Sequence, residues 1–114
     1  NQYLDYYNSN FLSIKKTSNN SKQSLEVIAY PNPFNNSTVF EIKNPINSDL
    51  LAFEIFDLQG RIVKNLDIIN NQNQYSRIKW YGINNQGRKV SQGVYIGRLR
   101  TKKGMFSVKL LYLK

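Results

Sequence analysis

The stretch Tyr30-Pro31-Asn32-Pro33-Phe34 (YPNPF) sets the local geometry from which the rest of the domain can be read. A proline has no amide hydrogen and a fixed φ, and it pushes the residue before it into an extended conformation. The two prolines around Asn32 therefore exclude a helix and a central strand at this point. We expect a stiff, extended corner that opens a domain built of β-strands.

Strand-like segments alternate with turn residues from residue 25 onward. Asp57-Leu58-Gln59-Gly60 predicts a tight hairpin, in which Gly60 supplies a positive φ and the Asp57 side chain caps the turn. Asn84-Asn85-Gln86-Gly87-Arg88 has the same chemistry, which indicates a second turn of this kind rather than an internal repeat. The expected strands cover residues 25–30, 38–43, 51–56, 61–66, 75–80, 94–100 and 105–113.

Seven strands without an amphipathic helix predict an all-β fold of two packed sheets. The expected architecture is a seven-stranded antiparallel immunoglobulin-like β-sandwich, and closure into a small barrel is the alternative. Leu51, Phe53 and Ile55 are expected on one face of their strand. The predicted core contains Phe53, Ile55, Leu66, Trp80, Tyr95 and Leu99.

The chain divides into a short N-terminal segment and one domain. Residues 25–114 form the predicted sandwich. Residues 1–24 contain an aromatic-rich stretch and then a polar run of Ser, Asn and Lys, so we expect either a linker or the end of an upstream cargo domain. The first residue is not Met, which suggests a fragment of a longer protein. No apolar run approaches the length of a membrane span.

The composition argues against catalysis. The chain has no histidine, no cysteine and only 7 carboxylates. A Ser/His/Asp set and a thiolate metal site are therefore unavailable, and Asp57 with Asp67 gives no usable carboxylate pair. We expect no enzymatic activity, no metal and no cofactor.

The positive charge is concentrated toward the C-terminus. The formal net charge is +9; residues 1–67 carry 6 basic and 7 acidic groups, whereas residues 68–114 carry 10 basic groups and no acid (10 − 1 = 9). Such a surface attracts anions, either lipopolysaccharide or an acidic protein, or it serves only for solubility. Nucleic-acid binding is not expected, because no recognised nucleic-acid motif accompanies the charge.

A series of spaced motifs extends from the corner to the last residue. YPNPF at 30–34 is followed by Ile55-Phe56-Asp57-Leu58-Gln59-Gly60-Arg61, Trp80-Tyr81-Gly82, Gly93-Val94-Tyr95 and Lys109-Leu110-Leu111-Tyr112-Leu113-Lys114. In this order the series resembles the type A C-terminal sorting domain of the Bacteroidota type IX secretion system. The resemblance covers residues 25–114. Gln92-Gly93 stands where the family more often has Ser-Gly.

The resemblance implies a secretion signal rather than a catalyst. Such a domain directs an upstream cargo in the same chain through the periplasm and across the outer membrane, to the cell surface or the medium. Its partners are translocon components and a sortase-like peptidase, which typically cleaves the domain, here before Leu25. The cargo is then attached to anionic lipopolysaccharide in some cases. The implied signal residues are Tyr30, Pro31, Asn32, Pro33, Phe34, Asp57, Gly60, Arg61, Gly93, Tyr95, Lys109, Leu111 and Lys114.

Other readings of the sequence remain. An accessory carbohydrate-binding module would use exposed aromatics, for which the candidates are Tyr3, Tyr6, Tyr7, Tyr75, Tyr81 and Tyr112. A structural immunoglobulin-like spacer, similar to the domain in flagellar hook-capping proteins, would need no site. The last strand, if it lies at a sheet edge, could pair with a receptor strand or with a second copy in a homodimer.

Overall fold

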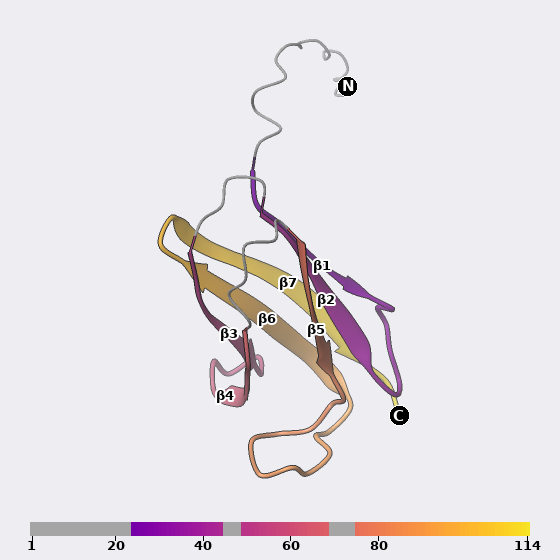
Figure 1. The fold of residues 1–114 in the computed structure, drawn as a ribbon. Coiled ribbons are helices and arrows are strands. Elements are labelled where there is room, and N and C mark those ends of the chain that lie inside the picture. The colour runs from indigo at the N-terminus through magenta and orange to yellow at the C-terminus, as the bar shows by residue number, and fades with distance from the viewer. Residues whose placement is uncertain (1–23, 45–48, 69–74) are drawn as a thin grey trace, which may run out of the picture.

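The computed structural model describes residues 24–44, 49–68 and 75–114, and these form a two-layered β-sandwich (Figure 1). One sheet has the order β1-β2-β5, with β1 at Glu26–Tyr30, β2 at Thr38–Lys43 and β5 at Tyr75–Trp80. The other has the order β4-β3-β6-β7, with β3 at Leu50–Phe56, β4 at Ile62–Leu66, β6 at Gly93–Thr101 and β7 at Gly104–Tyr112. All these strand pairs are antiparallel. The predicted sandwich is confirmed, and the sheets do not close into a barrel.

The core is made by alternate residues of both sheets, as expected for strands with one buried face. The buried members are Leu25, Phe34, Phe40, Ile42, Leu50, Phe53, Ile55, Trp80, Tyr95, Leu99, Leu110 and Tyr112. The predicted core residues Phe53, Ile55, Trp80, Tyr95 and Leu99 lie here. Leu66 is half-buried and packs against this cluster.

Leu51 does not share a face with Phe53 and Ile55, so that prediction is wrong. Leu51 is 51% exposed, and its neighbour Leu50 is buried in its place. The register of β3 against β6 shifts between Leu50 and Ala52. This irregularity breaks the alternation of faces, so that Leu50 rather than Leu51 faces the core.

Gly97 allows the two sheets to approach closely in the middle of β6. A Cβ atom at this position would lie 2.8 Å from Cε1 of Phe40 and 3.1 Å from Cε1 of Phe53. The two rings, which come from opposite sheets, lie 4.6 Å apart between centroids. The glycine therefore provides the space that these rings fill.

The described residues contain no helix long and apolar enough to span a bilayer.

Candidate functional site

The YPNPF corner crosses from one sheet to the other and joins the final strand. After β1 the chain leaves its sheet, and Phe34 forms a parallel bridge with Tyr112 of β7. The Phe34 amide donates to the Leu111 carbonyl at 3.0 Å, and the Leu113 amide donates to the Phe34 carbonyl at 2.9 Å. In Figure 1 the C-terminus lies beside the indigo segment that follows β1. We call this contact the corner junction: residues 30–34 against residues 109–114.

Asn32 extends the junction by imitating a strand backbone with its side chain. Its Nδ2 donates to the Lys109 carbonyl at 2.7 Å, and its Oδ1 accepts from the Leu111 amide at 3.0 Å. β7 is the last strand of its sheet, so these groups would otherwise face water along an open edge. The corner therefore covers the C-terminal half of that edge.

A chain of aromatic rings anchors the junction in the core. Phe34 stacks on Tyr112 with 4.9 Å between centroids and lies 5.7 Å from Trp80. Trp80 in turn meets Tyr95 edge-on at 5.6 Å. Aromatic pairs in such geometries add to the energy of burial. The four rings come from distant parts of the chain, so they hold the corner, β5, β6 and β7 together.

Two further hydrogen bonds hold the corner and the end of the chain beside it. Thr38, which is fully buried, donates from Oγ1 to the Pro31 carbonyl at 2.8 Å. A hollow of about 350 Å³ lies between the corner and the end of the chain, lined by Pro31, Pro33, Phe34, Asn35, Leu113 and Lys114. The Lys114 amide donates to Oε1 of Gln92 at 3.3 Å.

The first glycine turn is closed by Asp57, as predicted. Oδ1 of Asp57 accepts from the amides of Gln59 and Arg61 at 2.9 and 3.0 Å, and Oδ2 accepts from Nε of Arg61 at 2.9 Å. Gly60 has φ +83°, a conformation that other residues rarely adopt. The amide of Arg61, more than any other group, lowers the pKa of the Asp57 carboxyl below its usual value.

The second turn repeats this bonding with an uncharged residue. Oδ1 of Asn84 accepts from the amides of Gln86 and Arg88, both at 3.0 Å, and Gly87 has φ +81°. The turn also docks on β4: the Asn85 amide donates to the Val63 carbonyl, and the Asn85 Oδ1 accepts from the Asn65 amide, both at 3.0 Å. An asparagine therefore covers this edge of the four-stranded sheet, as Asn32 covers the opposite one.

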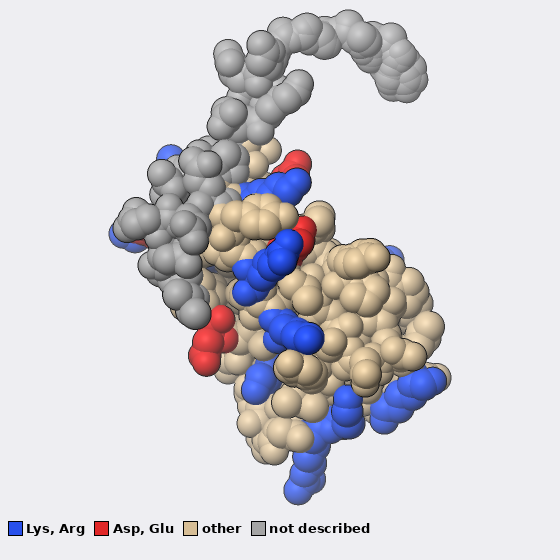
Figure 2. All heavy atoms as spheres, turned by 45° about the vertical axis from the view of Figure 1, so that its right-hand side comes forward, with Lys and Arg blue, Asp and Glu red and all other residues tan. Residues whose placement is uncertain are grey.

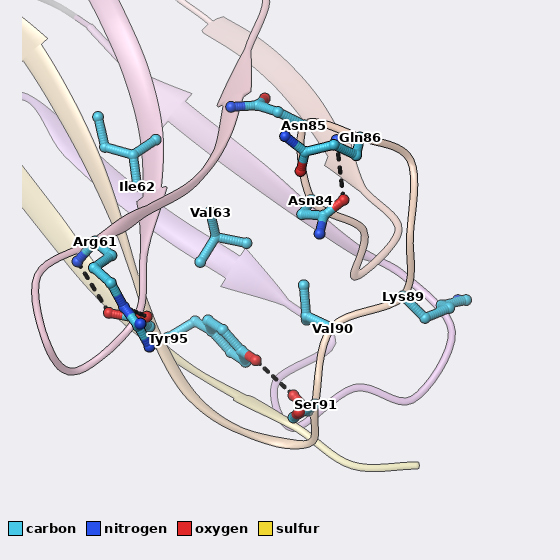
Figure 3. A pocket seen from close by; sticks show the side chains of 11 residues that line it. Arg61, Ile62, Val63, Asn84, Asn85, Gln86, Lys89, Val90, Ser91 and Tyr95 are labelled. Carbon is cyan, nitrogen blue, oxygen red and sulfur yellow. Dashed lines mark hydrogen bonds and ion pairs between the residues drawn. The ribbon is translucent and has the colours of Figure 1, made fainter.

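A groove of about 450 Å³ separates the two turns (Figure 3). The ring of Tyr95 points into it, and its hydroxyl donates to the Ser91 carbonyl at 2.6 Å. This bond to a backbone group four residues upstream is the tyrosine corner seen in immunoglobulin-like sandwiches. Burial of the ring raises the pKa of the Tyr95 hydroxyl. The groove's polar groups are largely committed to bonds within the turns.

The structure brings the predicted signal residues into two groups. The corner junction contains Tyr30, Pro31, Asn32, Pro33, Phe34, Lys109, Leu111 and Lys114. The groove is lined by Asp57, Arg61 and Tyr95, with Gly60 in the turn beside it. Gly93 belongs to neither group, but it pairs with Tyr112 across β6 and β7.

Sequence reasoning missed the structural roles of Asn85 and Gly97. The repeated turn pattern indicated a turn at Asn85, but nothing local indicated that the turn would reach β4. A glycine inside a strand is itself a signal of close backbone approach, and Gly97 could have been found in this way.

The candidate glycan platform does not assemble as expected. Tyr112 is a core residue, only 2% exposed, so it cannot offer a free face. Tyr75 and Tyr81 are 45% and 52% exposed. They are six residues apart along an extended segment, which places them roughly 20 Å from each other. Tyr3, Tyr6 and Tyr7 lie outside the described residues.

Lysine and arginine side chains gather on one face of the described part of the chain (Figure 2). Figure 2 shows one face on which lysine and arginine side chains form a band, with fewer carboxylates among them. Among the described residues, four carboxylates lie within ion-pair distance of Lys or Arg: Glu41, Asp49, Glu54 and Asp57. In the part of the chain that the structure describes, no cluster of three acidic side chains could hold a metal ion.

The family model for the secretion system C-terminal sorting domain matches residues 28–112. No curated protein matches the chain.

Two solved structures from Porphyromonas gingivalis share the fold. PorZ, a surface component of the type IX secretion system, matches with a TM-score of 0.55 and 18% identity over 77% of this chain and 11% of PorZ. Dimeric latent PorU matches with a TM-score of 0.58 and 27% identity over 78% of this chain and 9% of PorU. The chain thus spans about a tenth of the length of each protein.

Proposed function

Since the chain belongs to the secretion system C-terminal sorting domain family, we propose that it directs an upstream cargo in the same polypeptide through the type IX secretion system and across the outer membrane. The match over residues 28–112 carries this proposal. It is supported by the corner junction, in which two motifs about 80 residues apart form one contact. The proposal concerns the domain at residues 25–114 and not the activity of the cargo.

The route and the processing follow from the same proposal. The domain folds in the periplasm, is recognised by translocon components at the outer membrane, and brings the cargo to the surface or the medium. A sortase-like peptidase then cleaves the chain before Leu25, where β1 has not yet begun, and in some cases the cargo is joined to anionic lipopolysaccharide. The domain acts as a substrate in these steps and not as a catalyst.

The role of each predicted signal residue is proposed from its place in the fold. Asn32 and Phe34 hold the final strand, and Asp57, Gly60 and Arg61 shape the first turn. Tyr30, by contrast, is 74% exposed and supports little of the core. It is therefore a candidate for direct contact with a receptor.

A reporter fusion tests the proposal. Residues 15–114 are appended to a fluorescent protein that is targeted to the periplasm of a Bacteroidota host, with and without a working translocon. We expect the reporter at the surface or in the medium only when the translocon works, and we expect the domain to be clipped off. A folded fusion that stays in the periplasm of both strains would contradict the proposal.

A further inference from the structure

An apolar row runs across the outer face of the four-stranded sheet. Cross-strand partners lie on the same face, and the register pairs Ile62 with Phe56 and Phe56 with Ile96. Val94 and Leu111 form the neighbouring pair on β6 and β7. Alternate residues of β6 and β7, such as Tyr95 and Leu110, are buried, so these five side chains face outward. We call the five residues the apolar row.

The apolar row takes no part in stabilising the core. None of its members belongs to the buried core cluster or packs against it. Ile62 is 49% exposed, and the other four are half-buried against one another and their neighbours. The solvent face of an antiparallel sheet normally carries polar residues, so a contiguous apolar row there indicates a surface that is covered in use.

Positive charge borders the apolar row. Arg98 and Arg100 lie on the same face of β6, and Lys109 lies opposite Ile96 on β7. The Arg98 guanidinium lies over the Phe56 ring, 4.3 Å from its centroid. Glu54 is shared by both arginines, at 3.4 Å from Nη2 of Arg98 and 3.7 Å from Nε of Arg100. Two of the three cations on this face therefore share one carboxylate.

Arg98 is also incompletely satisfied within the chain. Its Nε is buried and has no hydrogen-bond acceptor among the described residues. Its bond to Glu54 is long at 3.4 Å. The Arg98 side chain is nevertheless 35% exposed, so its guanidinium can donate to a second carboxylate from outside.

We propose that the apolar row and its three cations form the docking surface for an acidic protein partner that presents apolar side chains flanked by Asp or Glu. This inference rests on the proposed function and assigns the partner to the translocon. A second copy of the chain fits poorly, because both copies would bring an excess of positive charge to the same contact. An anionic lipid surface would attract the same three cations, and the vesicle experiment below is the outcome that would favour it.

The test uses the reporter fusion with matched variants on the two outer faces. Ile62→Thr disturbs the apolar row, and Ile28→Thr removes an isoleucine of similar exposure, 45%, from the outer face of the other sheet. Arg100→Glu and Arg77→Glu form the charge pair, since each reverses an arginine that lies within ion-pair distance of a glutamate. We expect Ile62→Thr and Arg100→Glu to lower surface reporter at least tenfold, and the two controls to stay within about twofold of the parent. Urea denaturation of each purified chain confirms that all four variants fold.

The outcomes separate the two proposals. A parent fusion that is exported while Ile62→Thr and Arg100→Glu are exported equally well overturns the docking surface and leaves the sorting role standing. A parent fusion that is not exported overturns both. Export lost equally in the variants and their controls also overturns the docking surface, because the loss would then not be specific to this face.

A photo-cross-linking residue identifies the occupant. Benzoylphenylalanine at position 62, with position 28 as the control, should give an adduct with an acidic translocon protein only from position 62. An adduct with a second copy or with the fused cargo overturns the proposal. Co-sedimentation of the purified chain with phosphatidylglycerol vesicles, abolished by Ile62→Thr and kept by Ile28→Thr, also overturns it in favour of a lipid.

Discussion

Replacing Asn32 with alanine tests the most specific feature of the fold, the side chain that covers the edge of β7. The change removes two hydrogen bonds, to the Lys109 carbonyl at 2.7 Å and from the Leu111 amide at 3.0 Å. An intramolecular hydrogen bond contributes about 0.5–1.5 kcal/mol net. Asn32 is exposed, so water can reach both freed groups and no buried group is orphaned. Because both bonds are exposed, we take about 0.5–1 kcal/mol for each of them. We therefore expect the free energy of unfolding to fall by about 1–2 kcal/mol in total.

Amide hydrogen exchange locates the effect. The Leu111 amide points at Asn32, whereas the Leu110 amide faces β6, because the backbone groups of a strand alternate between its two neighbours. A loss of 1–2 kcal/mol corresponds to roughly 5–30-fold faster exchange if the edge opens locally. Leu111 should show this acceleration in Asn32→Ala, and Leu110 should show less.

Asn36→Ala is the matched control, because Asn36 is exposed in the same segment and makes none of these bonds. Asn32→Asp adds a second test: it keeps an acceptor for Leu111 but places a carboxylate against the Lys109 carbonyl. We expect it to destabilise the domain at least as much as Asn32→Ala. Equal Leu111 exchange in Asn32→Ala and Asn36→Ala would refute the edge-covering role.

Three further predictions concern the core and the turns. Gly97→Ala should destabilise the domain by about 1–3 kcal/mol, because the new Cβ meets the Phe40 ring at 2.8 Å. Denaturation in urea measures this loss of unfolding free energy. An unchanged value would mean that the two sheets can move apart freely. Asp57→Ala should destabilise the domain more than Asp57→Asn, since the second turn uses an asparagine for the same bonds. The folded-state pKa of Asp57 is depressed, so the carboxylate stabilises the fold above about pH 4, and this stabilisation is lost as the pH falls through the folded pKa. Asp57→Asn should remove this pH dependence of the unfolding free energy. Tyr95→Phe should cost about 1–2 kcal/mol in thermal or urea unfolding, because it leaves the carbonyl four residues upstream without its donor, while the ring packing against Trp80 is kept.

The sequence predicted those features that depend on nearby residues. The corner follows from two prolines, the two turns from an Asp or Asn three residues before a glycine, and most strands from a period of two in apolar residues. Trp80 was expected in the core because it shares a face of its strand with Ile78, whereas Arg77 and Lys79 lie on the other face. These signals act over a few residues, so they can be read without the fold.

The remaining features depend on contacts between distant segments. Asn32 meets Lys109 and Leu111, which are 77 and 79 residues away, and no local pattern states which edge the corner will cover. Tyr112 was a candidate surface aromatic in the sequence, but its ring is covered by Phe34, which stacks on it from the distant corner. Leu51 was misplaced because a register shift in β3 leaves no mark in the apolar pattern.

The covered edge of β7 bears on how the domain is recognised. Strand addition at this edge needs free backbone groups, and the sequence suggested the final strand for that role. Residues 109–113 already pair with the corner, so a receptor strand or a second copy must displace Asn32 and Phe34 there or use the edge before Lys109. Displacement would also unstack Phe34 from Tyr112 and Trp80, which links the loss of the edge to the loss of core packing.

Binding to the apolar row requires none of these changes, because its side chains face outward in the folded domain. For this folded domain we therefore expect recognition on the sheet face rather than along the last strand. The Ile62→Thr and Asn32→Ala variants separate the two modes. The first should block export without unfolding, and the second should weaken the fold without removing the docking surface.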